Sequence, residues 1–333
     1  MIKEVKSTAS IKQQNIVKVK RLILQCGSVT KPEVAEKTGL SVVTCGTILN
    51  ELTANGTIVE KQLMLSNGGR PAMSYQYNTD SGNILCAFVY TENHECFLRY
   101  QIIDILGNIK DVGVSLEKKF HVKTLTEHIK GICKKELNVK VITLGLQGCI
   151  NNGIVEYSDI TELSGVNLAQ IIQEETGITT LVENDMNTVT LGYSKKNSDE
   201  KNVAMLFFPK GQTPAGGFIV DGNILRGTSN LAGELSFFPF GFDKKTQQAA
   251  FSNVKKALPF VNQLVIATTV FMDPAVIVIT GGLAGELSER EITSYLKKTL
   301  NRNQLPKIEI RPMVEAEYIA GLYNIGANYL VEA

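Results

Sequence analysis

Short segments rich in carboxylate and amide side chains are the part of this sequence best suited to acid–base chemistry. Glu183-Asn184-Asp185 and Asn187 follow a strand-like run, and Glu234 follows Ala232-Gly233. A carboxylate within hydrogen-bond distance of a hydroxyl group can accept its proton, and a neighbouring amide can hold the ligand. The alternative for the first segment is a polar turn that only ends a strand.

The first 80 residues carry a different pattern, which is typical of DNA-binding proteins. Residues 11–25 have apolar side chains at helical spacing, and Gly27 ends this expected helix. Thr30 and Glu33 form the capping pattern of a short second helix. Ser41 is a good N-cap for a third helix that ends near residue 56. This order predicts a helix-turn-helix, whose third helix enters the major groove with its N-terminal residues first.

Short polar side chains on that third helix can approach base edges without steric cost. The residues that we expect to read bases are Ser41, Thr44, Thr47 and Asn50. Strand-like runs at residues 57–61 and 73–77 flank a glycine-rich loop that holds Arg70 between Gly69 and Pro71. This arrangement predicts a β-wing whose Arg70 enters the narrow minor groove of A·T-rich DNA. A plain three-helix bundle is the structural alternative.

Composition and charge narrow the classes of protein further. The 333 residues are 44% hydrophobic and 20% charged, which excludes a largely disordered chain, a collagen-like repeat and a small disulfide-stapled scaffold. The net charge is +1, but residues 1–80 hold ten basic and six acidic residues. A basic N-terminal module on a mildly acidic body is typical of a DNA-binding head joined to a sensing or catalytic domain.

Cysteine spacing and hydropathy indicate the compartment. The six cysteines are scattered without a C-x-x-C pair, and the three histidines show no metal-ligand spacing, so we expect free thiols in a reducing cytoplasm. The N-terminus has no apolar segment typical of a secretory signal. No run of about 18 apolar residues is present, so no membrane partner is expected.

Beyond residue 80, strand-like and helix-like segments alternate, as in an α/β fold. We expect strands at residues 84–90, 97–105, 141–146, 180–182, 203–208, 217–220 and 275–280. We expect helices at residues 122–136, 168–176 and about 316–330, the last with small residues that allow close packing, and a helix-rich stretch at about 244–271.

These motifs resemble one known family. Residues 11–78, with their Gly68-Gly69-Arg70-Pro71 wing, resemble the winged helix-turn-helix of regulators of the ROK family (repressors, open reading frames and kinases). The remaining chain resembles the sugar-kinase-like body of that family. The resemblance implies a winged helix-turn-helix at residues 1–80 and a two-lobed actin-like ATPase fold. It places the first lobe at residues 81–190, completed by the helix at 315–333, and the second at 191–314.

The resemblance also assigns site residues. It implies that Asn184, Asp185 and Glu234 bind a sugar, and that Asp185 stands where the kinases have their general base. Gly145 and Gln147 belong to a loop beside the same pocket, with Gln147 where the family usually has proline.

Departures from the family pattern concern cofactors. Ser236 occupies the place of the zinc- and sugar-binding histidine, and no cysteine follows Cys149, so we expect no zinc. The first phosphate loop reads Val89-Tyr90-Thr91-Glu92-Asn93-His94, without glycine. In the second loop, residues 211–217, Pro214 removes an N–H donor. Gly281-Gly282 is retained, although it can serve packing alone. We therefore expect no ATP binding, no catalytic residues, and Asp185 as a relic of the kinase base.

The sequence therefore predicts a transcriptional regulator, specifically a repressor of carbohydrate-metabolism genes. We expect it to bind double-stranded operator DNA as a homodimer or homotetramer, with a sugar or phosphosugar as effector. One alternative is a regulator whose body only dimerises or binds a protein. The other, less supported by the phosphate loops, is an active ATP-dependent sugar kinase.

Overall fold

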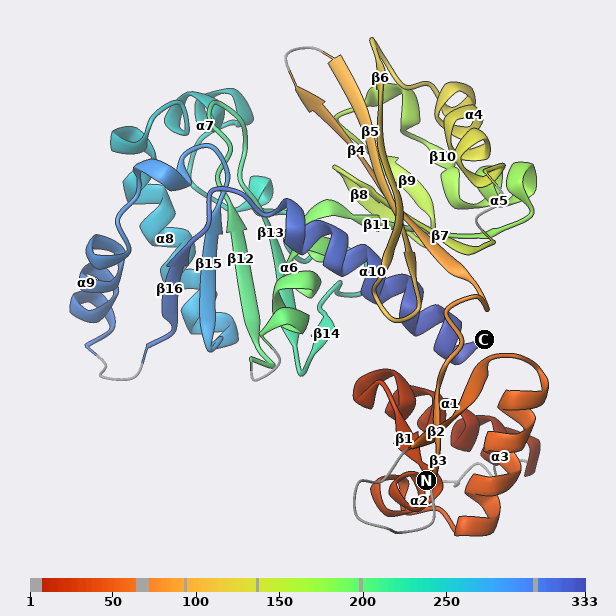
Figure 1. Ribbon diagram of the computed structural model, residues 1–333. Coiled ribbons are helices and arrows are strands. Elements are labelled where there is room, and N and C mark those ends of the chain that lie inside the picture. The colour runs from red at the N-terminus through yellow and green to blue at the C-terminus, as the bar shows by residue number, and fades with distance from the viewer. Residues whose placement is uncertain (1–7, 64–71, 93–94, 136–137, 198–199, 302–304) are drawn as a thin grey trace.

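The computed structural model describes residues 8–63, 72–92, 95–135, 138–197, 200–301 and 305–333. Figure 1 shows a small N-terminal head joined to two α/β lobes. In the described part of the chain, none of the helices has the length and apolarity needed to cross a membrane.

The head begins with three helices whose ends are fixed by local caps. Its elements are α1 (Thr8–Cys26), β1 (Val29–Thr30), α2 (Lys31–Thr38), α3 (Val42–Ala54), β2 (Ile58–Leu63) and β3 (Ala72–Tyr77). The predicted capping box of Thr30 and Glu33 is present, Gly39 ends α2 in the left-handed conformation, and the Ser41 side chain caps α3. The predicted helices and both strands are confirmed. The loop with Arg70 lies outside the described residues.

The first lobe is a five-stranded sheet covered on both faces. The sheet order is β11-β7-β4-β5-β6, with strands β4 (Asn83–Glu92), β5 (Glu95–Asp104), β6 (Ile109–Glu117), β7 (Val139–Leu146) and β11 (Thr179–Asn184). Helices α4 (Val122–Cys133) and α5 (Leu168–Thr176) pack on one face. The predicted helix at residues 122–136 extends too far at its C-terminal end, because α4 ends at Cys133 and Lys134 is its C-cap. A small sheet of β8 (Cys149–Asn151), β9 (Ile154–Tyr157) and β10 (Val166–Asn167) is inserted between β7 and α5.

The second lobe repeats this plan with the sheet order β14-β13-β12-β15-β16. Its strands are β12 (Val203–Phe207), β13 (Ala215–Val220), β14 (Asn223–Ile224), β15 (Val276–Thr280) and β16 (Lys307–Ile310). Alternate side chains divide between two cores. Ala204 and Leu206 pack toward α7 (Lys244–Ala250), α8 (Val254–Met272) and α9 (Glu289–Leu300), whereas Val203 and Met205 face the first lobe.

Two helices fill the space between the sheets: α6 (Asp185–Lys196) and α10 (Glu315–Glu332). They approach so closely that glycine is required at their crossing. A Cβ atom added to Gly192 would lie 1.8 Å from the carbonyl oxygen of Glu317, and one added to Gly321 would lie 1.9 Å from that of Thr188. In Figure 1, α10 runs from the space between the lobes to the head.

Candidate functional site

The polar segment at residues 183–187 is the junction between β11 and α6. The Asn184 side chain caps α6, because its Oδ1 accepts a hydrogen bond from the Asn187 N–H at 3.0 Å. Its Nδ2 donates to the carbonyl oxygen of Gly148 at 2.7 Å. The Asn184 side chain is thus a structural cap, and its role in ligand binding stays a prediction.

A small cavity lies between this junction and the second lobe. Its wall includes Asn184 and Glu234 together with Asn187 and Cys149, but not Asp185, Gly145 or Gln147. Its volume is about 20 Å³, which holds one water molecule and is far below the 300 Å³ or more of typical ligand pockets. The cleft is therefore closed in this structure, and a sugar needs movement of the surrounding loop to enter.

Asn187 is a residue of this cavity that the predicted site set omitted. It is buried, and its Nδ2 donates to Glu183 Oε1 at 3.1 Å. Its Oδ1 has no hydrogen-bond partner among the described residues, which is unusual for a buried amide oxygen. A ligand hydroxyl in the cavity would supply the missing donor.

An ion pair ties the two lobes together beside the cavity. Arg226, from the loop after β14, pairs with Glu183 at the end of β11, and its Nε lies 3.2 Å from Glu183 Oε2. Glu183 is only 8% exposed, and its other oxygen accepts from the Asn184 N–H at 3.0 Å. The sequence contained no signal for Arg226, because its partner is 43 residues away in the chain.

Two carboxyl groups, that of Glu234 in the cavity wall and that of Asp185 at the start of α6, have raised pKa values. Burial raises the pKa of Asp185 to about 7. A hydrogen bond from the Met186 N–H lowers this pKa, and repulsion from Asp159 and Glu234 raises it further. Burial also raises the pKa of Glu234, while Lys244 lowers it and Asp159 raises it. A carboxyl that titrates near neutrality can accept or donate a proton to a ligand hydroxyl.

Gly145 and Gln147 have neighbours other than the cavity. A Cβ atom on Gly145 would lie 2.4 Å from the ring of Tyr318, so this glycine makes room for the tyrosine. Tyr318 stacks on Phe88 with ring centroids 4.4 Å apart, and its buried hydroxyl has no partner among the described residues. The Gln147 carbonyl accepts a hydrogen bond from Ser158 Oγ at 2.8 Å. The role of Gly145 and Gln147 beside a sugar pocket therefore stays a prediction.

The segments in the place of phosphate loops use their backbone groups internally. Residues 89–92 belong to β4, and Asn93 and His94 lie outside the described residues. In the second segment, Gly211 N–H donates to the Phe251 carbonyl at 2.9 Å and Gly216 N–H to that of Gly233 at 2.8 Å. A Cβ on Gly281 would lie 2.7 Å from the carbonyl oxygen of Phe208, so this glycine is required for packing. The N–H groups of Gly211 and Gly216 thus donate to protein carbonyl groups, where a phosphate loop would donate to phosphate oxygens.

The loop after Glu234 is held by aromatic packing, and its residues do not fit a zinc ion. Five rings make a continuous cluster with centroid separations from 4.9 to 6.2 Å: Phe238, Phe240, Phe242, Phe251 and Phe260. Ser236 contributes its carbonyl, which accepts from Gln247 Nε2 at 3.2 Å. Within the described ranges, no group of three metal-ligating side chains is close enough to hold an ion.

The candidate DNA-reading surface is the exposed side of α3. Ser41, Thr47 and Asn50 are exposed and Thr44 is half-buried, so the four predicted readers share this accessible surface. Sequence reasoning missed the two side chains that project furthest, Val42 and Val43, which are 57% and 79% exposed. The sequence analysis considered only the polar residues of this helix and overlooked two adjacent valines in its first turn.

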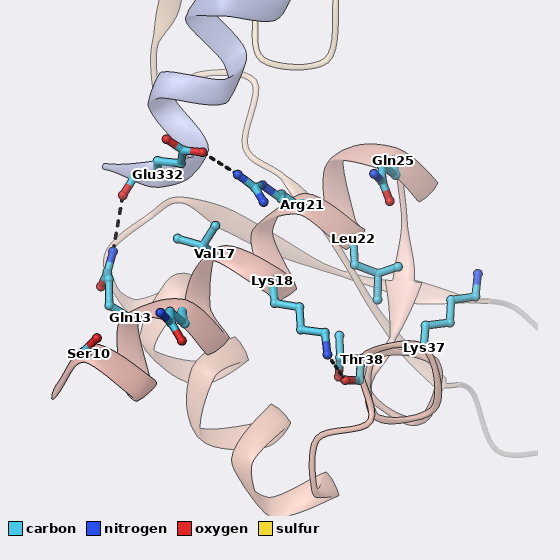
Figure 2. A pocket seen from close by; sticks show the side chains of 11 residues that line it. Ser10, Gln13, Val17, Lys18, Arg21, Leu22, Gln25, Lys37, Thr38 and Glu332 are labelled. Atoms are coloured by element: carbon cyan, nitrogen blue, oxygen red, sulfur yellow. Dashed lines mark hydrogen bonds and ion pairs between the residues drawn. The ribbon is translucent and has the colours of Figure 1, made fainter. Parts of the chain in front are cut away.

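The head contacts the body at the end of α10 (Figure 2). Arg21 of α1 forms an ion pair with Glu332, and Gln13 Nε2 donates to the Glu332 carbonyl at 3.5 Å. Lys20, only 8% exposed, donates to the Leu330 carbonyl at 3.4 Å, and burial lowers its pKa. An open cavity of about 710 Å³, lined partly by Lys18 and Arg21, lies beside this junction.

Near the opposite end of α10, burial raises the pKa of the Tyr318 hydroxyl, and the nearby charges of Asp185 and Glu183 raise it further. The 18 residues of α10 span about 27 Å at 1.5 Å per residue. A single helix therefore runs from the neighbourhood of Asp185 to the N-terminal head.

Comparison with known proteins agrees with this architecture. The chain is 23% identical over 240 residues to a xylose repressor of Caldicellulosiruptor bescii, a match that covers 70% of this chain and 60% of that protein. A ROK family transcriptional regulator, a homolog of the E. coli MLC protein, superposes with a TM-score of 0.71 at 17% identity, over 96% of this chain and 97% of that one. A ROK hexokinase of Thermus thermophilus gives 0.57 at 17% identity, over 74% and 98%.

The hexokinase match covers about three quarters of this chain, whereas the regulator match covers nearly all of it. At these identities both matches establish the fold alone: a small head joined to a body with the two-lobed fold that the hexokinase also has. The family model for ROK proteins matches residues 115–248. The likeness to the ROK family therefore covers the part of the chain from β6 to α7.

Proposed function

We propose that this chain is a transcriptional repressor whose affinity for operator DNA is set by a sugar bound between its lobes. The observation that carries the proposal is α10, which runs from Tyr318, near Asp185, to the head at Glu332. The likeness to a xylose repressor supports a sugar effector and places xylose first among the candidates. We further propose a two-fold dimer that reads a palindromic operator.

The effector acts, in this proposal, by opening and refilling the cleft. A sugar would have to displace the loop that carries Arg226 and Glu234, because the present cavity is too small for it. A sugar can alter DNA binding only by binding the two lobe arrangements with different affinity. The contacts of α10 with α1 would then transmit the difference to the head.

The direct test is fluorescence anisotropy of the full chain on DNA from its own promoter region, at fixed salt. The titration is repeated with xylose, other pentoses, hexoses and their phosphates. We expect tight, sequence-specific binding that one sugar class alters. Glu332→Ala should leave operator affinity without sugar nearly unchanged and reduce the sugar effect, with Glu315→Ala at the other end of α10 as the matched control. Absence of specific binding would overturn the repressor proposal.

A second candidate function is a regulator whose body binds no small molecule. The 20 Å³ cavity favours it. Thermal unfolding with the same sugar panel separates the two candidates, since a ligand that binds only the folded state raises the melting temperature. No shift with any sugar, together with sugar-independent DNA binding, would favour the second candidate.

We also propose that the body transfers no phosphoryl group. Gly211 and Gly216 donate their N–H groups to protein carbonyls, and Pro214 has no N–H to offer. An assay of ADP release from Mg-ATP with each sugar should give no turnover above background. Sugar-dependent ADP release would restore the kinase alternative and make Asp185 a working base.

A further inference from the structure

The first turn of α3 presents the most exposed large apolar side chains of the head. Val43 is 79% exposed and Val42 57%, compared with 47% for Ile11 and 38% for Met73. Within the described residues of the head, these four are the large hydrophobic side chains that reach such exposure. Two adjacent valines on this one turn are therefore a distinct apolar tip.

Local stability does not account for the two valines. Valine is a weaker helix former than alanine or leucine, because its branched Cβ restricts the side chain against the preceding turn. Neither side chain is buried, so packing does not offset this cost. The α3 helix is capped by Ser41 and anchored by buried residues such as Ile48 and Leu49 instead.

The polar neighbours of these valines spend hydrogen bonds within the helix. Ser41 Oγ accepts from the Thr44 N–H at 3.1 Å and lies 2.8 Å from Thr44 Oγ1, with which it shares a hydrogen bond. Thr47 Oγ1 donates to the Val43 carbonyl at 3.1 Å. These hydroxyl groups therefore have fewer hydrogen bonds to offer to base edges than their sequence pattern predicts. The valine methyl groups, in contrast, are exposed.

In the major groove, thymine is the base that presents a methyl group, and apolar side chains recognise it by direct contact. The N-terminal residues of a recognition helix are those that reach base edges. A cation is already beside α3, since a Cβ on Gly46 would lie 3.5 Å from Lys31 Nζ. The two valines can contact thymine methyl groups, and the ammonium group of Lys31 beside α3 can face the DNA phosphates.

We propose that Val43, supported by Val42, determines operator specificity by packing against thymine C5-methyl groups. This inference rests on the proposed DNA-binding function and names the base that α3 reads. It assigns specificity to two apolar side chains in addition to Ser41, Thr44, Thr47 and Asn50.

The test compares thymine with uracil, which differs only in lacking the methyl group. A duplex is first selected from a random pool by binding to the full chain, and each thymine is then replaced singly by uracil. At one or two positions, we expect each replacement to weaken binding about fourfold, as for one buried CH2-sized group. Val43→Ala should weaken binding to the thymine duplex by a similar factor and lose the discrimination at one of these positions. Val42→Ala should do so more weakly.

The control variant is Ile11→Ala, which truncates an exposed apolar side chain on α1 and should keep the full thymine–uracil ratio. Circular dichroism verifies that each variant is folded, as expected for such exposed positions. Specific binding that ignores every uracil replacement would overturn the inference but leave the repressor proposal standing. A thymine–uracil ratio that Val43→Ala and Val42→Ala leave unchanged would also overturn it. Failure to select any duplex would overturn the repressor proposal itself.

Discussion

Replacing Asp185 with asparagine should stabilise the protein, and the gain should grow with pH. Burial raises the pKa of this carboxyl from 3.8 to about 7, so the folded state holds a proton that the unfolded state has already lost. Stability therefore falls as pH rises from about 4 to 7. At about 1.4 kcal/mol per pH unit, the ionised carboxylate costs the folded state about 4 kcal/mol above pH 7.

Asparagine removes that charge and keeps an oxygen that can accept from the Met186 N–H at the place where Asp185 Oδ1 now lies at 2.8 Å. The linkage relation gives a cost of about 2 kcal/mol at pH 5 and about 4 kcal/mol at pH 8. We therefore expect Asp185→Asn to raise the free energy of unfolding at pH 8 by about 2–3 kcal/mol more than at pH 5. Urea unfolding followed by circular dichroism measures both values.

The matched control is Asp243→Asn, the same chemical change at the N-cap of α7. Hydrogen bonds from Thr246 lower the pKa of Asp243, so this group is ionised in folded and unfolded chains alike above pH 5. Its replacement should leave the dependence of stability on pH between 5 and 8 unchanged. An equal gain for Asp185→Asn at both pH values, or no gain at all, would refute the assignment of a raised pKa.

Three further variants test other parts of the molecule. Arg226→Ala leaves Glu183 buried without its guanidinium partner and should lower the free energy of unfolding by about 1–3 kcal/mol, less than for a fully buried pair because Arg226 is partly exposed; unchanged stability would contradict the ion pair as an interlobe tie. Phe240→Ala should cost about 2–4 kcal/mol, whereas EDTA should leave the melting temperature unchanged, and a chelator-induced drop would point to a metal. Arg70→Ala should weaken operator binding by about 1–3 kcal/mol and flatten the preference for flanking A·T pairs, and an unaltered preference would remove the role given to the wing.

The head was predictable because its signals are local. Thr30 with Glu33, Gly39 and Ser41 each fix a helix end within four residues of sequence, and the structure has the predicted caps. The exposure of Val43 is a different kind of property, because it depends on which side of α3 faces the rest of the head. Helix propensity and capping therefore predicted the bounds of α3, but they did not predict which of its side chains are exposed.

The body was predictable as an α/β fold, but several of its elements were missed, among them α6, α9 and β16. Helix α6 contains Thr188, Thr190 and Gly192, which are poor helix formers, and it is helical because it is packed between two sheets and α10. Helix α9 and strand β16 were overlooked although α9 has a readable Ser288 cap. The closed cavity and the Arg226–Glu183 pair depend on contacts between distant segments, so no local pattern could have indicated them.

The packing of α10 constrains how a sugar signal can reach DNA. Gly192 and Gly321 bring α6 and α10 into backbone contact, and such a crossing cannot slide by small steps without a clash. Tyr323 and Tyr329 of α10 are hydrogen-bonded to the first lobe, and Glu332 at the end of α10 is paired with Arg21 of the head, so we expect the first lobe, α10 and the head to move together. Movement of the second lobe as the cleft opens then leaves the head fixed on the first lobe. In a dimer, that motion changes the spacing of the two heads only when the copies are joined through the second lobe. The repressor proposal therefore requires the dimer contact on the second lobe, and a contact confined to the first lobe would leave the sugar without a route to the operator.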